Sequence, residues 1–201
     1  MIKFLLTLSS LLIFSQGIYS QESGSLFDAI ENKPSENSLL PDTMIFTQRM
    51  LWGEKGVMRT SNLFPLSKES REREMKIRRG MLTAHQLVGY ATLLGMIGQG
   101  ITGVQLYQGN HKIKDLHEAM GAFTTASYFT GAGLSLFAPP PLIRTKTKGL
   151  NSIKAHRWLA TVHFSAMVAT NLLAENDRKY HRAASFTLFG SYALAILSFK
   201  F

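Results

Sequence analysis

Four histidines stand in the same local context, and their imidazoles could bind a metal. His85, His117, His156 and His181 are each followed, four residues later, by a Gly, Ala or Ser. On a helix, residues four positions apart lie on the same face, one turn from each other. The small residue would therefore leave space beside the imidazole. A haem macrocycle is flat and would fit in such a space. The iron of a b-type haem can be bound by two imidazoles, one on each side of the metal.

Long apolar segments surround these histidines and must position them. Each histidine lies inside or just before a window that contains no Asp, Glu, Lys or Arg: residues 80–111, 119–143, 158–174 and 183–199. About 20 apolar residues span a bilayer, so two windows are long enough and two are marginal. A soluble helix of this length would show a charged stripe. The sequence therefore predicts an all-α fold, an integral membrane up-and-down four-helix bundle over residues 80–201.

The direction of the helices decides which histidines can meet. The expected helices cover residues 80–107, 116–137, 155–174 and 180–201, and their short connections make sequential helices antiparallel. His85 and His156 then lie near one membrane face, and His117 and His181 near the other. The first and third helices are diagonal across the bundle, as are the second and fourth. The residues leave three readings open: two haems, one haem, or four structural and interfacial histidines.

Two short stretches carry a resemblance to a known family. They are Leu-His-Glu-Ala-Met-Gly at residues 116–121 and Ala-His-Arg-Trp-Leu at residues 155–159. With the order of the histidine-led helices, they resemble the cytochrome b561 superfamily of di-haem membrane proteins, over residues 80–201 only. The resemblance implies transmembrane electron transfer through two bis-histidine b-type haems. It implies that the axial pairs are His85 with His156 and His117 with His181, which would hold the haem iron.

Other residues near the histidines have less specific roles. His163 follows His156 by seven residues, on nearly the same helix face and about 10 Å deeper. It could be a replacement ligand, a contact to a haem propionate or a water, or a core histidine bonded to a neighbouring Ser or Thr. His111 is expected to be a solvated loop residue. Arg157 and Arg182 could pair with propionates or anchor the helices at the membrane interface.

The first 79 residues differ from the rest of the chain. Residues 1–20 have the charged start and short apolar core of a secretory signal peptide, with an uncleaved anchor as the alternative. Residues 21–79 form a polar segment that is expected to be extracytoplasmic, in a bacterial inner membrane protein. It contains a short charged helix that Ser67 would cap and whose charges are expected to be solvated. The basic residues of this helix favour the reverse orientation under the positive-inside rule.

Composition removes several functions. The chain has no cysteine, which excludes disulfides, thiolate metal sites, iron–sulfur clusters and a cysteine nucleophile. The net charge of +9 comes from Lys and Arg at the edges of the apolar windows, so the expected partner is membrane lipid and not nucleic acid. Hydrolytic catalysis is poorly supported, because the sequence has no acid pair, zinc-like histidine spacing or nucleophile constellation. Two hypotheses remain: an electron-transfer protein or oxidoreductase with unknown donor and acceptor, and a haem-free membrane scaffold or assembly protein. A homo-oligomer is compatible with both.

Overall fold

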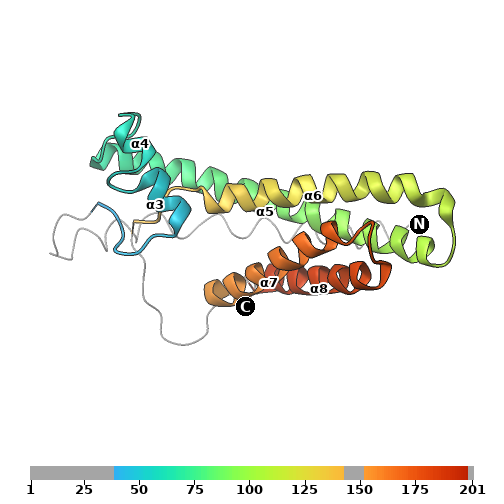
Figure 1. Cartoon of the computed structure of the whole chain (residues 1–201). Coiled ribbons are helices and arrows are strands. Elements are labelled where there is room, and N and C mark those ends of the chain that lie inside the picture. Colours follow the sequence, from blue (N-terminus) through green and yellow to red (C-terminus); the bar gives the residue numbers. More distant parts are fainter. Residues whose placement is uncertain (1–38, 143–151, 199–201) are drawn as a thin grey trace, which may run out of the picture. The chain divides into compact units, whose positions relative to one another are not determined.

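The computed structural model describes residues 39–142 and 152–198, and every regular element in these ranges is helical, which confirms the all-α fold class. The predicted signal peptide (residues 1–20), the first part of the polar segment (residues 21–38) and residues 143–151 and 199–201 lie outside the described residues. The elements, shown in Figure 1, are α3 (Phe46–Trp52), α4 (Val57–Thr60), α5 (Lys68–Tyr107), the 3-10 helix η2 (His111–Ile113), α6 (Lys114–Leu136), α7 (Ser152–Leu172) and α8 (Arg178–Leu197).

Helix α5 unites two segments that the sequence suggested as separate helices. It begins after Ser67, whose side-chain oxygen accepts a hydrogen bond from the Ser70 N–H at 3.2 Å, as predicted for the N-cap residue of this helix. It then continues without a break through Gly80 for 40 residues. Since each residue adds 1.5 Å, the helix is about 60 Å long, about twice the thickness of a hydrocarbon core. Its charged first third therefore extends beyond the apolar part.

The other long helices begin and end close to their predicted positions. Helix α6 ends at Leu136, shortly before three consecutive prolines that cannot continue a helix. Helix α8 begins after Asp177, whose carboxylate accepts hydrogen bonds from the N–H groups of Lys179 and Tyr180. This N-cap was not predicted, although Asp is a preferred residue there.

The four long helices form two antiparallel hairpins. Helix α5 packs along α6, which we call the first hairpin, and α7 packs along α8, the second hairpin (Figure 1). The first hairpin is close because glycines of α5 face α6. A Cβ atom added at Gly95 would lie 2.5 Å from the Thr124 hydroxyl oxygen, so a larger residue does not fit there.

Fewer interactions join the two hairpins. The Tyr192 hydroxyl of α8 donates to the Gly89 carbonyl of α5 at 3.1 Å. The Thr125 hydroxyl of α6 donates to the Asn171 side-chain oxygen of α7 at 3.1 Å. These contacts place α5 beside α8 and α6 beside α7, so neighbouring helices run alternately in opposite directions.

Residues 39–67, which we call the cap, cover the end of the first hairpin where α5 begins and α6 ends. The side chains of Gln48 and Trp52 donate to the main-chain carbonyls of Ala138 and Phe137, at 3.2 and 2.9 Å. Glu74 of α5 is completely buried and pairs with Arg59 of the cap and with Arg71 of its own helix. The expectation of a solvated charge run is therefore wrong at Arg71 and Glu74, because the cap removes them from water.

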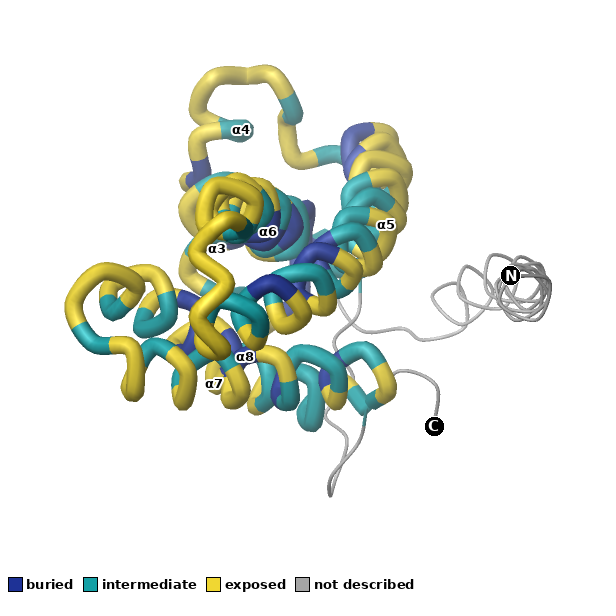
Figure 2. Tube along the Cα trace, turned by 90° about the vertical axis from the view of Figure 1, so that its right-hand side faces the viewer, coloured by how far each residue is buried: buried dark blue, intermediate teal, exposed yellow. Residues whose placement is uncertain are grey.

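The surface of the long helices is strongly apolar. Among the described residues, α5 is the one helix long and apolar enough to cross a membrane by length and composition, whereas the sequence suggested four. Buried stretches along the helices are short, and exposed residues separate them (Figure 2). Large exposed side chains include Leu87, Leu94 and Ile101 on α5, Phe123 on α6, Trp158 and Leu172 on α7, and Phe186 and Leu194 on α8.

Candidate functional site

The imidazole rings of His85 of α5 and His156 of α7 lie close together, one from each hairpin. Their ring centroids are 6.4 Å apart and the ring planes are perpendicular, at 90°. Both residues are half-buried. The structure thus brings together the first pair of histidines that the sequence suggested, one from each hairpin.

The Nδ1 atom of each of these rings faces a main-chain carbonyl. His85 Nδ1 lies 2.8 Å from the Gly131 oxygen of α6, and His156 Nδ1 lies 3.3 Å from the Ala195 oxygen of α8. A carbonyl oxygen can only accept, so Nδ1 carries the hydrogen and donates. In the neutral imidazole Nε2 then has the lone pair, which is the form that binds a metal.

In the second pair, His117 of α6 and His181 of α8, each Nδ1 atom also has a hydrogen-bond partner on a neighbouring helix. His117 Nδ1 lies 2.9 Å from the Thr102 hydroxyl oxygen of α5, and His181 Nδ1 lies 2.9 Å from the Thr170 carbonyl oxygen of α7. The Thr170 hydroxyl oxygen is buried with no hydrogen-bond partner among the described residues, so a polar atom is left available at this level.

A regular spacing relates the two pairs. The three main-chain acceptors each lie 14 residues after the candidate histidine of their own helix. They are Gly131 after His117 (131 − 117), Thr170 after His156 (170 − 156) and Ala195 after His181 (195 − 181). At 1.5 Å per residue, 14 residues correspond to about 21 Å along a helix. The histidines therefore lie at two levels about 21 Å apart, and each level takes one histidine from each hairpin.

The ring separation at the first level can be compared with that of two imidazoles bound to one metal. A metal–imidazole bond of about 2.0 Å puts each ring centre roughly 3.1–3.2 Å from the metal, so two opposed ligand rings have centres about 6.3 Å apart. The His85–His156 separation of 6.4 Å agrees with this value. The described residues contain no group of three or more His, Cys, Asp or Glu that could hold a metal ion. A bis-histidine haem needs only two protein ligands.

The space expected beside the histidines is filled at two positions. A Cβ atom added at Gly89 would lie 3.5 Å from the Tyr192 hydroxyl, and one added at Gly121 would lie 3.5 Å from the Gln99 amide nitrogen. These glycines, four residues after His85 and His117, allow neighbouring side chains to approach. At both positions a neighbouring side chain is therefore at ordinary van der Waals distance from an added Cβ atom.

His163 lies deeper in the protein, between the two levels. It is buried, and its Nδ1 is hydrogen-bonded to the Tyr128 hydroxyl at 2.6 Å. The Tyr192 ring centroid lies 5.1 Å away. Of the roles that the sequence left open, this arrangement favours the core histidine, with a tyrosine as its partner in place of the expected Ser or Thr. His111 is exposed, as expected, although it begins the 3-10 helix η2.

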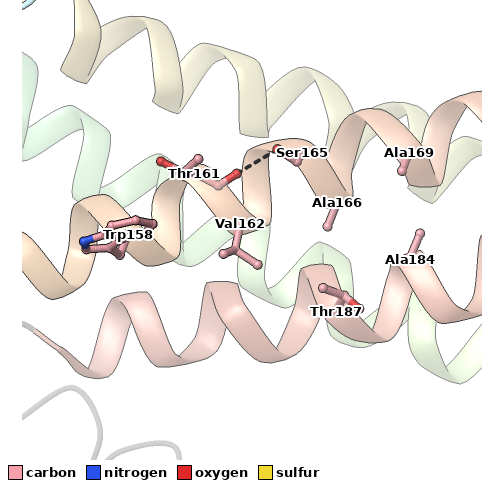
Figure 3. Close-up of a pocket in the computed structure, with 8 residues that line it drawn as sticks. All are labelled: Trp158, Thr161, Val162, Ser165, Ala166, Ala169, Ala184 and Thr187. Carbon is pink, nitrogen blue, oxygen red and sulfur yellow. Dashed lines mark hydrogen bonds between the residues drawn. The ribbon is translucent and has the colours of Figure 1, made fainter.

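A separate groove runs along the outer side of the second hairpin. It has a volume of about 470 Å³ and is lined by small and apolar residues of α7 and α8, with Trp158 at one end (Figure 3). The Thr161 and Ser165 hydroxyls donate to carbonyls one turn earlier in their own helix, so these two donors do not point at a ligand. None of the candidate histidines lines this groove, and it is not part of the candidate site.

Comparisons of the chain with family models, with curated proteins and with solved structures find no significant match. The resemblance to the cytochrome b561 superfamily therefore depends on the two stretches at residues 116–121 and 155–159 and on the order of the histidines. The function must be argued from the chemistry of the site itself.

Proposed function

We propose that α5, α6, α7 and α8 form an integral membrane four-helix bundle that binds one b-type haem at each histidine level and conducts electrons between the levels. The single observation that carries this proposal is the geometry of His85 and His156. Their ring centroids are 6.4 Å apart, and a main-chain carbonyl orients each Nδ1. A packed core histidine needs no such matched partner across the bundle.

The distribution of polar and apolar side chains supports a membrane location. Exposed apolar residues cover the long helices, with 66% exposure at Leu87, 69% at Leu94 and 72% at Trp158. The interior is comparatively polar, and its buried residues include Thr92, Thr102, Thr124, His163 and Ser191. In a soluble protein of this size, the large apolar side chains would be buried and the polar side chains would be exposed. Lipid around the bundle accounts for both observations.

The protein groups at each level have defined parts in this function. A bound haem supplies the one-electron chemistry. The histidines would offer Nε2 to the haem iron, and their Nδ1 partners orient the rings and raise their basicity. Between the levels, Tyr128, His163 and Tyr192 pack with ring centroids 5.1–5.9 Å apart, which fills this part of the interior with side chains instead of water.

One observation favours the haem-free scaffold as a second candidate function. Tyr192 and Gln99 fill the spaces beside Gly89 and Gly121, so the small residues after these histidines serve helix packing. A scaffold would need the histidines only for hydrogen bonds between helices. It predicts a protein that remains colourless when haem is abundant.

The test is a haem count on the purified protein, expressed with ample haem. We expect two b-type haems per chain by the pyridine haemochrome assay, and a dithionite-reduced minus oxidised spectrum typical of bis-histidine ligation. His85→Ala and His156→Ala should lose the same haem, and His117→Ala and His181→Ala should lose the other. His111→Ala, at an exposed position, is the matched control and should retain both.

Three results would change the conclusion. A colourless wild-type protein would contradict the proposal and support the scaffold. One haem that depends on His85 and His156 alone would restrict the function to the first level. Equal loss in every variant, the His111→Ala control included, would mean that the histidines do not differ in ligation.

A further inference from the structure

One of the four histidines has a hydrogen-bond partner of a different kind. His85, His156 and His181 each face a main-chain carbonyl. His117 faces the side-chain hydroxyl of Thr102. A side-chain partner depends on the residue type, so the chemistry at this position can be altered by a single substitution, unlike that at the other three.

The surroundings of Thr102 hold its hydroxyl in one orientation. Thr102 is buried, with 4% exposure, and its hydroxyl donates to the Gly98 carbonyl at 2.9 Å, one turn earlier in α5. The Gln99 carbonyl oxygen lies 3.2 Å from the same hydroxyl oxygen. With its one hydrogen directed to these main-chain carbonyls, the hydroxyl accepts from His117. His117 Nδ1 must then carry a hydrogen, and the lone pair is on Nε2.

The backbone of α5 comes close to His117 at the same point. A Cβ atom added at Gly103 would lie 3.3 Å from the His117 Cε1 atom, which is a tight contact. Thr102 and Gly103 together restrict both the rotation and the position of the imidazole. Few other orientations of the His117 ring are compatible with these neighbours.

We propose that Thr102 is a positioning residue for His117: its hydroxyl selects the tautomer that offers Nε2 to haem iron and sets the reduction potential at the level of His117 and His181. The inference rests on the proposed function. An acceptor at Nδ1 makes the imidazole a more basic ligand, which favours the oxidised metal. Loss of this acceptor therefore raises the midpoint potential at this level and leaves the level of His85 and His156 unchanged.

The test compares three variants of the full chain, loaded with haem, by spectroelectrochemical titration. Thr102→Val keeps the shape of the side chain and removes the hydroxyl, and Thr102→Ser keeps the hydroxyl. Thr124→Val is the matched control, because Thr124 is equally buried and its hydroxyl donates to the Met120 carbonyl of its own helix. At one applied potential, Thr102→Val should lower the ratio of oxidised to reduced haem threefold to tenfold at one haem only. This change corresponds to a positive shift of the midpoint potential of about 28–59 mV.

The outcomes separate this inference from the proposed function. A shift in Thr102→Val with wild-type values in Thr102→Ser and Thr124→Val supports the inference, as does loss of one haem in Thr102→Val alone. Unchanged midpoints in Thr102→Val, equal shifts of both haems, or the same change in Thr102→Ser would overturn it while the haem count stands. A wild-type protein without haem would overturn the proposed function, and the inference with it.

Discussion

Replacement of Glu74 by glutamine should release the cap from the long helices. Glu74 is completely buried, and the side chains of its partners Arg59 and Arg71 are 5% and 2% exposed. Glutamine has nearly the same shape but no charge, so two buried guanidinium groups would lose their counter-charge. Burial lowers the pKa of Arg71, and the charge of Glu74 opposes this change. Removal of one partner from a buried ion pair costs about 3–5 kcal/mol, which is the loss expected for Glu74→Gln.

Trp52 allows the effect to be measured at the cap itself. The chain has two tryptophans, and Trp52 is buried in the cap while Trp158 is 72% exposed on α7. In a Trp158→Phe background, urea titration followed by tryptophan fluorescence reports the opening of the cap alone. Glu118→Gln is the control, because Glu118 forms an exposed ion pair with Lys114. A loss below about 1 kcal/mol in Glu74→Gln, or an equal change in the control, would refute the role of this buried cluster in holding the cap.

Three further predictions concern packing and the membrane. Gly95→Ala should destabilise the protein by about 1–3 kcal/mol through the contact with Thr124, Thr124→Ala should relieve it, and Gly100→Ala, with nothing within 4 Å, should not destabilise. Thermal unfolding in detergent measures this, and a loss in Gly100→Ala equal to that in Gly95→Ala would contradict it. Met167→Ala, at a position 2% exposed, should cost about 2–5 kcal/mol in the same assay, and a cost below 1 kcal/mol would argue against a tight core. Leu94→Lys should reduce membrane insertion by about 3 kcal/mol relative to Leu94→Ala if lipid surrounds α5, and equal insertion of the two variants would argue against it.

Local features of the fold could be predicted because they depend on neighbouring residues. Ser67 could be predicted as the N-cap residue of a helix because serine is preferred at N-cap positions. The end of α6 could be predicted because the prolines after it cannot extend a helix. The fusion of the charged and apolar segments into α5 was not predicted. The change in composition at Gly80 suggested a boundary, but glycine within a long helix does not have to end it.

Features that depend on contacts between distant residues could not be predicted. The burial of Glu74 requires Arg59, which lies 15 residues away in another element. The meeting of His85 and His156 follows from helix direction, but their acceptors at Gly131 and Ala195 depend on how far one helix slides along the next. Every residue has a main-chain carbonyl, so the residue type does not show which carbonyl accepts a hydrogen bond. Only the 14-residue spacing from each helix's own histidine would have indicated them.

The division of the long helices into two hairpins has a consequence for how the protein is assembled. Contacts within each hairpin are extensive, whereas those between the hairpins are sparse. Each level takes one histidine from α5 or α6 and the other from α7 or α8. A metal bound by both histidines of one level would therefore be a crosslink between the two hairpins. If the proposed haems bind, their binding would complete the assembly of the two hairpins, and the protein with haem should resist separation of the hairpins better than the protein without haem.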